Sequence, residues 1–258
     1  MATSIPILTF HAVDDRPSVI SFAPRLFESG ISRLHGAGYR TLSLLELVDC
    51  IRRGVSFPER SLALTFDDGY QSVYDHAFPI LQRYGFSATV FLTVGKMREK
   101  TAAERLPSME GRSMLSWREI KEMQRWGIAF GAHTLTHPDL TRLRVDQLEA
   151  EVVSGKDVIE DALGAQVNSF AYPFGRYDQQ CREIVSRHFV CACSDRLGLL
   201  RAGSDPYAME RVDSYYLRSE KLFAAIPTKF FPLYIHARAV PRQLRRTVKL
   251  NIANRFQR

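Results

Sequence analysis

The sequence of 258 residues lacks the features that would direct a chain into or across a membrane. No segment approaches the roughly 18 consecutive apolar residues of a membrane span. The first six residues carry neither a basic leader nor a long apolar run. Internal repeats and low-complexity segments are absent too. Because 45% of the residues are hydrophobic, the chain can bury a full-sized core. We therefore expect a large globular domain located in the cytoplasm.

The cysteines lack the spacing of a metal or redox motif. There are four of them, at positions 50, 181, 191 and 193, and no two form a C-x-x-C pair. Cys191 and Cys193 alternate within an apolar, strand-like run. We interpret all four as reduced residues that pack in the core, as is usual in a reducing compartment.

Short apolar runs alternate with amphipathic segments along most of the chain. The pattern predicts strands at 5–10, 61–66, 88–94, 127–132, 167–172, 189–193 and 208–212, and helices at 22–39, 44–51, 72–84, 116–126, 145–163 and 179–187. A polar loop is expected at 95–113. This alternation is typical of parallel β/α units, which build either a barrel or a doubly wound sheet. In such folds the functional site lies at the carboxyl ends of the strands.

Two adjacent carboxylates end the strand predicted at 61–66. Asp67 and Asp68 are followed by Gly69, so one interpretation is an ordinary turn. Neighbouring residues on a strand point to opposite sides, which predicts different partners for the two carboxylates.

Two histidines follow the strand predicted at 127–132. His133 and His137 are four residues apart, so on a helical turn both imidazoles would share one face. Together with Asp67 or Asp68 they would give three ligands and leave positions open for water and substrate. The remaining carboxylate would be free to act as general base. These ligand types suit zinc, with cobalt, nickel, manganese or iron as alternatives.

Three segments resemble the motifs of a known family. They read Thr-Phe-Asp-Asp-Gly at 65–69, His-Thr-Leu-Thr-His at 133–137 and Phe-Ala-Tyr-Pro-Phe-Gly at 170–175. The sequence is similar in these segments to the polysaccharide deacetylases, carbohydrate esterase family four, with the NodB-homology domain. The resemblance runs from about residue 7 to residue 213. It implies a distorted (β/α) barrel of about seven parallel strands and metal-dependent hydrolysis of an N-acetyl group on a sugar.

The resemblance also implies roles for single residues. Asp67 is expected to be the base, and Asp68, His133 and His137 the metal ligands. For the oxyanion we expect a backbone N–H donor at Tyr172. Ala171 stands where the family has an arginine that orients the base. Two residues could replace that arginine, Arg211 near the end of a late strand and Arg176 after the third motif; we favour Arg211 and expect Asp213 beside it to orient the acid or tune the base.

The general acid departs from the family pattern as well. Many members carry it on a histidine in a C-terminal Leu-x-His motif, whereas the late histidine of this chain, His236, lies in a basic tail. His11 ends the first predicted strand, and one branch of the family is permuted so that its acid lies there. We therefore expect His11 to protonate the leaving amine, the alternative being a histidine held by loop backbone.

The substrate is expected to lie against the third motif. Pro173, Phe174 and Tyr177 would line the groove together with Asp213, and Trp117 and Tyr215 are further candidates for stacking on a sugar. The expected function is removal of an N-acetyl group from an amino sugar of a polysaccharide, an oligosaccharide or a lipid-linked glycan. Two alternatives remain: a deformylase or other amide hydrolase acting on a non-polymeric substrate, and a catalytically idle barrel that binds a glycan.

Acidic residues are missing from the last thirty positions. Residues 229–258 contain eight of the 35 Lys and Arg residues and no Asp or Glu, so the net charge of +7 belongs to this tail. Apolar residues interleave with the cations, which is typical of a helix on an anionic membrane surface. The alternative is a helix packed on the barrel with a solvated basic face. Nucleic-acid binding is disfavoured because no base-reading motif is present. We expect a barrel domain over 1–221 and a basic amphipathic extension over 222–258 that contacts the inner face of a membrane.

Overall fold

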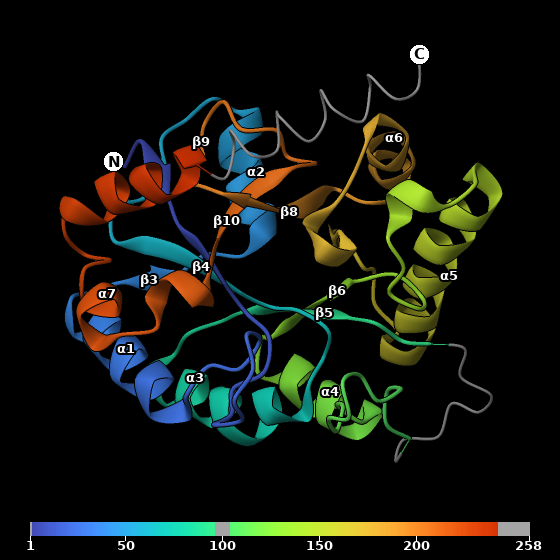
Figure 1. Ribbon diagram of the computed structural model, residues 1–258, viewed down its shortest axis with the longest axis horizontal. Coiled ribbons are helices and arrows are strands. Elements are labelled where there is room, and N and C mark those ends of the chain that lie inside the picture. The colour runs from blue at the N-terminus through green and yellow to red at the C-terminus, as the bar shows by residue number, and fades with distance from the viewer. Residues whose placement is uncertain (1, 96–103, 242–258) are drawn as a thin grey trace.

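Seven parallel strands form a closed barrel (Figure 1). The computed structural model describes residues 2–95 and 104–241. The barrel strands are β2 (Ile7–Phe10), β4 (Ser61–Phe66), β5 (Thr89–Leu92), β6 (Ala129–Ala132), β7 (Ser169–Ala171), β8 (Cys191–Leu197) and β10 (Met209–Asp213). Strand β2 closes the barrel because it pairs with β4 on one side and β10 on the other. The predicted barrel of about seven strands is confirmed.

Three short strands lie outside the barrel. Strand β3 (Arg40–Thr41) pairs with β4, and β1 (Ser4–Ile5) pairs with β9 (Leu200–Arg201) in a separate antiparallel sheet. Strand β8 runs four residues further than predicted.

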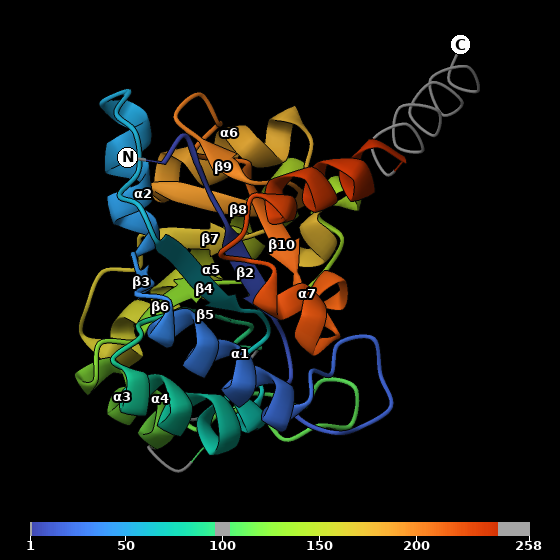
Figure 2. The ribbon, with the colours of Figure 1, turned by 90° about the vertical axis from the view of Figure 1, so that its left-hand side faces the viewer.

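Helices surround the barrel, as Figures 1 and 2 show from two sides. They are α1 (Pro24–Gly36), α2 (Leu44–Arg52), α3 (Phe78–Tyr84), α4 (Trp117–Arg125), α5 (Val145–Leu163), α6 (Gln179–His188) and α7 (Glu220–Ala224). The predicted cap of α4 is present, since the Ser116 hydroxyl accepts from the Glu119 N–H and the Glu119 carboxylate from the Ser116 N–H. A π-helical turn (Val73–Ala77) separates α3 from the residues after Asp67 and Asp68.

The cysteines occupy the positions that the sequence indicated. Cys181, Cys191 and Cys193 are buried, Cys50 is half-buried, and all four are free thiols. Cys191 and Cys193 lie in an apolar cluster with Ala63 and Phe91. Burial raises the pKa of the Cys193 thiol to about 12, so this thiol stays protonated and unreactive at neutral pH.

The predicted polar loop is only partly described, since 96–103 lie outside the described residues. Residues 104–116 fold back over the barrel through short bridges, in which Tyr70 pairs with Met114 and Met109 with Arg112. Arg112 is buried, forms an ion pair with Asp14 and donates to the Ser21 hydroxyl. This segment is therefore tied to the loop after β2 and forms one wall above the strand ends.

The start of the C-terminal extension packs on the barrel. Phe223 of α7 faces Gly30 of α1 so closely that a Cβ at Gly30 would meet its ring. Residues 230–241 are helical, and Phe231, Ile235 and Ala239 of this helix are buried in the main core. The packed-helix alternative therefore describes one side of 230–241, while 242–258 lie outside the described residues. No helix in the described ranges is both long enough and apolar enough to cross a membrane.

Candidate metal and catalytic site

Asp68, His133 and His137 converge at the carboxyl ends of the strands. Asp68 follows β4 and the histidines follow β6, two strands further around the barrel. The Asp68 Oδ1 atom lies 3.4 Å from the His133 Nε2 and 3.5 Å from the His137 Nε2. The two Nε2 atoms are 3.2 Å apart. The predicted ligand triad thus forms one compact cluster.

The orientation of His133 is set by a backbone carbonyl. Its Nδ1–H donates to the Ala171 carbonyl oxygen at 2.6 Å, which leaves the Nε2 lone pair directed at the cluster. His137 is held by its backbone, because its N–H donates to the Thr134 hydroxyl at 2.9 Å. Ala171, which stands where the family has an arginine, therefore orients the His133 ring through its backbone carbonyl.

The donor set fits a divalent cation. Asp68 Oδ1 is buried and has no hydrogen-bond partner, although an unpaired buried carboxylate oxygen is costly. Burial and the nearby His133 lower the pKa of His137 to about 4, so His137 is neutral and its lone pair is free. Burial also acts to lower the pKa of His133, but the carboxylates of Asp68 and Asp67 outweigh it and raise that pKa. A cation among two nitrogens and one oxygen would satisfy the orphaned oxygen.

Asp67 has different partners from Asp68. Its Oδ1 and Oδ2 accept from the Arg211 Nη1 and Nη2, each at 2.8 Å, in a two-pronged pair. Both side chains are buried, and the Arg211 Nε–H donates to the Ser194 carbonyl at 2.9 Å. Burial acts to raise the pKa of Asp67, but the guanidinium outweighs it and the pKa is lowered. Asp67 is therefore a fixed, ionised carboxylate beside the ligand triad.

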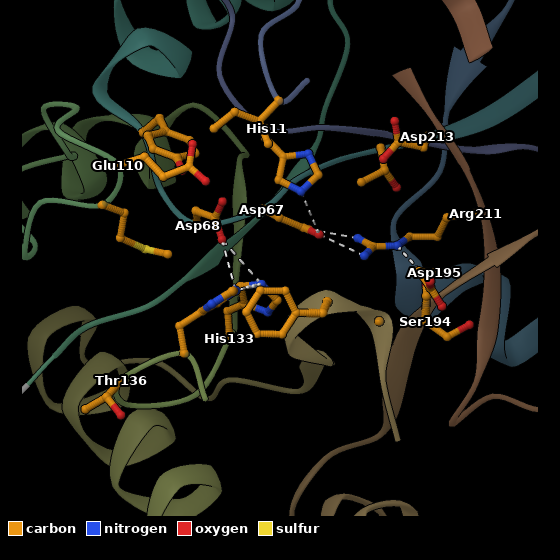
Figure 3. A pocket seen from close by; sticks show the side chains of 17 residues that line it. His11, Asp67, Asp68, Glu110, His133, Thr136, Ser194, Asp195, Arg211 and Asp213 are labelled. Atoms are coloured by element: carbon orange, nitrogen blue, oxygen red, sulfur yellow. Dashed lines mark hydrogen bonds and ion pairs between the residues drawn. The ribbon is translucent and has the colours of Figure 1, made fainter. Parts of the chain in front are cut away.

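His11 lies on the opposite side of Asp67 from His133, as Figure 3 shows. It follows β2, and its Nε2 lies 3.9 Å from the Asp67 Oδ2. Asp213 ends β10 in the same region, where one oxygen accepts from the Tyr215 N–H at 2.7 Å. Barrel closure between β2, β4 and β10 brings His11, Asp67 and Arg211 together from distant parts of the chain.

Backbone strain concentrates at this site. Six non-glycine residues in the described ranges have positive φ, and five of them belong to the site or its walls; these are Asp68, Glu110, Thr134, His137 and Phe174. Such conformations cost on the order of 1–3 kcal/mol each and persist where surrounding structure holds them. Gly69 has φ of 87°, and a Cβ there would lie 2.9 Å from Leu92.

The residues line a cavity of about 560 Å³. Phe174 forms one wall, with its ring centroid 4.7 Å from that of His137. The sequence did not single out several other lining residues, namely Thr9, Ile20, Tyr70, Met109, Glu110, Thr136, Ser194 and Asp195. Thr9 and Ser194 lie in strands that end at the site, and Thr136 lies within the second motif. These positions in the sequence could have predicted that the three residues line the cavity.

The expected roles of several third-motif residues need correction. The Tyr172 N–H donates to the Cys193 carbonyl and its hydroxyl to the Tyr207 carbonyl, so Tyr172 is buried and turned away from the cavity. Tyr177 stacks on Tyr172 with centroids 4.8 Å apart, and neither Tyr177 nor Pro173 lines the cavity. Phe174 and Asp213 do line it.

The remaining candidates lie elsewhere. The Arg176 guanidinium pairs with Asp139 at 2.7 Å, whereas Arg211 pairs with Asp67. Trp117 is buried in the core, and Tyr215 is exposed outside the cavity lining. His236 is exposed on the 230–241 helix and is not a lining residue.

A two-histidine, one-carboxylate cluster with a second carboxylate beside it is the arrangement of hydrolases that act with a divalent cation. Comparison with known sequences gives the family. Residues 54–190 match the sequence profile described as Polysaccharide deacetylase, and the chain belongs to this family of hydrolases.

Relatives and solved structures agree with this assignment. The chain is 28% identical over 209 residues to YxkH of Bacillus subtilis (strain 168), whose name places it among the polysaccharide deacetylases; the alignment covers 81% of this chain and 70% of YxkH. It is 30% identical over 170 residues to the poly-β-1,6-N-acetyl-D-glucosamine N-deacetylase of Staphylococcus aureus (strain MRSA252), covering 62% of this chain and 56% of that enzyme.

The fold is similar to that of the Streptococcus pyogenes deacetylase PplD, solved in complex with acetate. The TM-score is 0.73 at 27% identity, over 83% of this chain and 93% of PplD.

Proposed function

We propose that this chain is a metal-dependent deacetylase that hydrolyses the N-acetyl group of an amino sugar in a polysaccharide or oligosaccharide. The observation that carries the proposal is the separation of the two adjacent carboxylates. Asp68 lies with two histidines, and Asp67 lies with Arg211 and His11. The name of the Staphylococcus aureus relative, which specifies a polymer of N-acetylglucosamine, supports this substrate class.

Asp68, His133 and His137 would hold the cation. When bound, a divalent cation supplies a Lewis acid for the acetyl carbonyl and lowers the pKa of water, and zinc suits the donor set, with cobalt, nickel, manganese or iron as alternatives. The chain supplies the proton transfers and the orientation of the reacting groups.

Asp67 accepts the proton of the attacking water. A base must be ionised and fixed to do this, and the two-pronged pair with Arg211 provides both conditions. Arg211 is therefore a positioning residue that acts through Asp67. It replaces the arginine that the family carries where this chain has Ala171.

The oxyanion donor is assigned to the N–H of Phe174 in place of Tyr172. In the 3-10 turn Pro173–Gly175, the N–H groups of Gly175 and Arg176 donate to the carbonyls of Tyr172 and Pro173. The N–H of Phe174 precedes these bonds, so the turn leaves it without an acceptor. Since Phe174 lines the cavity, this amide is the nearest equivalent of the predicted donor.

His11 protonates the leaving amine. Water adds to the acetyl carbon, the C–N bond breaks, and the nitrogen leaves with a proton as the free amine while acetate forms. The 3.9 Å between the His11 Nε2 and the Asp67 Oδ2 supports this pair of roles, because both groups could reach the same substrate amide. Asp213 lines the same cavity, and its negative charge helps to raise the pKa of Arg211.

The idle glycan-binding barrel is disfavoured by the presence of a partnered base. A binding protein has no use for a carboxylate that is buried, ionised and held by a guanidinium next to an open ligand cluster. A deformylase would use the same groups, and only the acyl pocket would differ.

Product analysis tests the proposal. Purified full-length protein, supplied with zinc, cobalt or nickel, is incubated with N-acetylglucosamine oligomers, with N-formyl analogues and with a small N-acetylated amine. We expect acetate and free amine from the oligomers, with one acetate per amine. The Asp67→Asn protein, purified in the same way, controls for contaminating hydrolases.

Each other outcome supports a rival. Preferential release of formate would establish a deformylase. Hydrolysis of the small N-acetylated amine alone would show that the substrate is not a carbohydrate. Oligomer binding without any release in all three metals would establish the idle barrel.

A further inference from the structure

The helix at 230–241 has two apolar sides. One side carries Phe231, Ile235 and Ala239, which are buried against the barrel. The other carries Phe230, Leu233 and Val240, whose exposed fractions are 56%, 69% and 41%. Leu233 and Ile235 are two residues apart, about 200° around a helix, so the two stripes face opposite directions.

The exposed stripe is unusual for this chain. Nine large hydrophobic residues in the described ranges are exposed, and three of them lie on this one helix of twelve residues. The Phe230 ring stacks on Tyr234, with centroids 6.1 Å apart, which extends the apolar surface along the helix. The Tyr234 hydroxyl donates to the Tyr216 carbonyl, so this flank of the helix is anchored to the barrel.

Positive charge accompanies the stripe. Lys229 is exposed just before the helix, on the side of the stripe. Arg238 is exposed on the flank anchored to the barrel, where its guanidinium lies 5.6 Å from the centroid of the Tyr216 ring. The chain contains no Asp or Glu after Glu220, and the seventeen residues that follow position 241 add six Lys or Arg residues. Apolar residues interleave with these cations at 244, 248 and 252. The region therefore combines apolar contact area with a net positive charge.

We propose that the helix at 230–241 docks on the surface of an anionic phospholipid bilayer, with Phe230, Leu233 and Val240 entering the interface. Charge complementarity selects this occupant. A second copy would bring the same cations against themselves, and nucleic acid would leave the aliphatic Leu233 and Val240 uncovered. Anionic lipid satisfies both the charge and the apolar area, and it lines the cytoplasmic leaflet. The cytoplasmic location stays a prediction from the sequence.

Co-sedimentation with vesicles tests the proposal on the full chain. The vesicles are pure phosphatidylcholine or an equal mixture of phosphatidylcholine and phosphatidylglycerol. We expect binding to the mixed vesicles that weakens as salt rises, and little binding to phosphatidylcholine alone. The Phe230→Ser/Leu233→Ser protein should partition at least about tenfold less, because two large apolar side chains no longer insert. Lys229→Gln should weaken binding by about fivefold.

Val19→Ser is the matched control, since Val19 is 72% exposed but lies in the loop after β2. It should bind as the wild type does. Thermal unfolding and acetate release from a soluble oligomer should be equal in all variants. Equal, salt-insensitive pelleting with both vesicle types would overturn the proposal. Wild-type binding by the double variant, or a concentration-dependent dimer that the double variant loses, would do so as well.

Discussion

The two halves of the site differ in how far apart their residues lie in the sequence. The ligand half, Asp68 with His133 and His137, comes from two short motifs, and its Asp68 Oδ1 atom has no hydrogen-bond partner. The base half, Asp67 with Arg211 and His11, is gathered from three strands and has a full set of contacts between Asp67 and Arg211. One half therefore offers a set of donors that would suit a cation, and the other keeps a carboxylate ionised.

This difference explains how adjacent residues take different roles. Asp67 and Asp68 are neighbours, yet Asp67 faces the closing strands β2 and β10, and Asp68, with φ of 74°, turns toward the loop after β6. The positive φ costs energy, and Gly69 lets the chain continue through the tight turn. Substitutions in one half should therefore leave the other half intact.

His137→Ala should have the largest effect, because it breaks the ligand half. With two ligands left, bound metal should fall well below the roughly one per chain expected of the wild type, and deacetylation should fall to background. Metal content by plasma mass spectrometry and acetate release measure the two losses.

Thermal unfolding gives an independent control for this variant. Added zinc should raise the Tm of the wild type and not that of His137→Ala, since only the wild type binds it in the folded state. In chelator the two Tm values should agree. A variant that keeps its metal and its turnover would show that His137 is not a ligand.

His11→Gln should break the base half on its acid side. We expect kcat for the amide substrate to fall about 10²-fold or more, with metal content unchanged, because the amine then leaves without a proton donor. Hydrolysis of an aryl acetate should fall much less, since that leaving group departs as an anion. An equal loss of kcat on both substrates would show that His11 is not the general acid.

Arg211→Lys should weaken the base half without removing its charge. Lysine cannot provide two parallel N–H donors, so the pKa of Asp67 should rise. A base acts only above its pKa, so the acidic limb of the kcat/KM profile should move to higher pH. The expected loss at neutral pH is about 10–100-fold, as for other supporting contacts. An unshifted limb would contradict the positioning role.

Thr65→Val should have the smallest effect and sharpen the contrast. The Thr65 hydroxyl lies 2.9 Å from the Thr9 hydroxyl and accepts a long bond of 3.4 Å from Arg211. Its loss should lower the free energy of unfolding by about 1–3 kcal/mol, measured in urea, since a buried hydroxyl loses its partner. Turnover should change by less than that of Arg211→Lys. A larger loss of turnover would mean that Thr65 helps to orient the base.

The ligand half could be predicted from sequence because its signals are local. A strand ending in Asp-Asp-Gly and a His-x-x-x-His after another strand predict that these side chains meet. The choice of Asp68 over Asp67 as the ligand came from the family resemblance. Local patterns, such as the mostly apolar run at 61–66, also predicted the parallel β/α units. They left a barrel or a doubly wound sheet open, and the family resemblance predicted the barrel.

The base half depends on contacts between distant residues. The sequence favoured Arg211 but left Arg176 as an alternative, and the pairing of β10 with β2 brings Arg211 to Asp67. The role of Tyr172 could not be predicted, because it depends on whether its N–H is used by the neighbouring strand β8, as it is. Residues 104–116, which supply Glu110 to the cavity, carried no periodic signal.

The most direct test compares Asp67→Asn with Asp68→Asn for metal content and turnover in the same preparation. Both changes remove one charge and keep the size of the side chain. Asp67→Asn should retain about one metal per chain and lose about 10²–10⁴ in kcat, whereas Asp68→Asn should lose both metal and turnover. Equal metal contents in the two variants, whether both retained or both lost, would contradict the separation of roles.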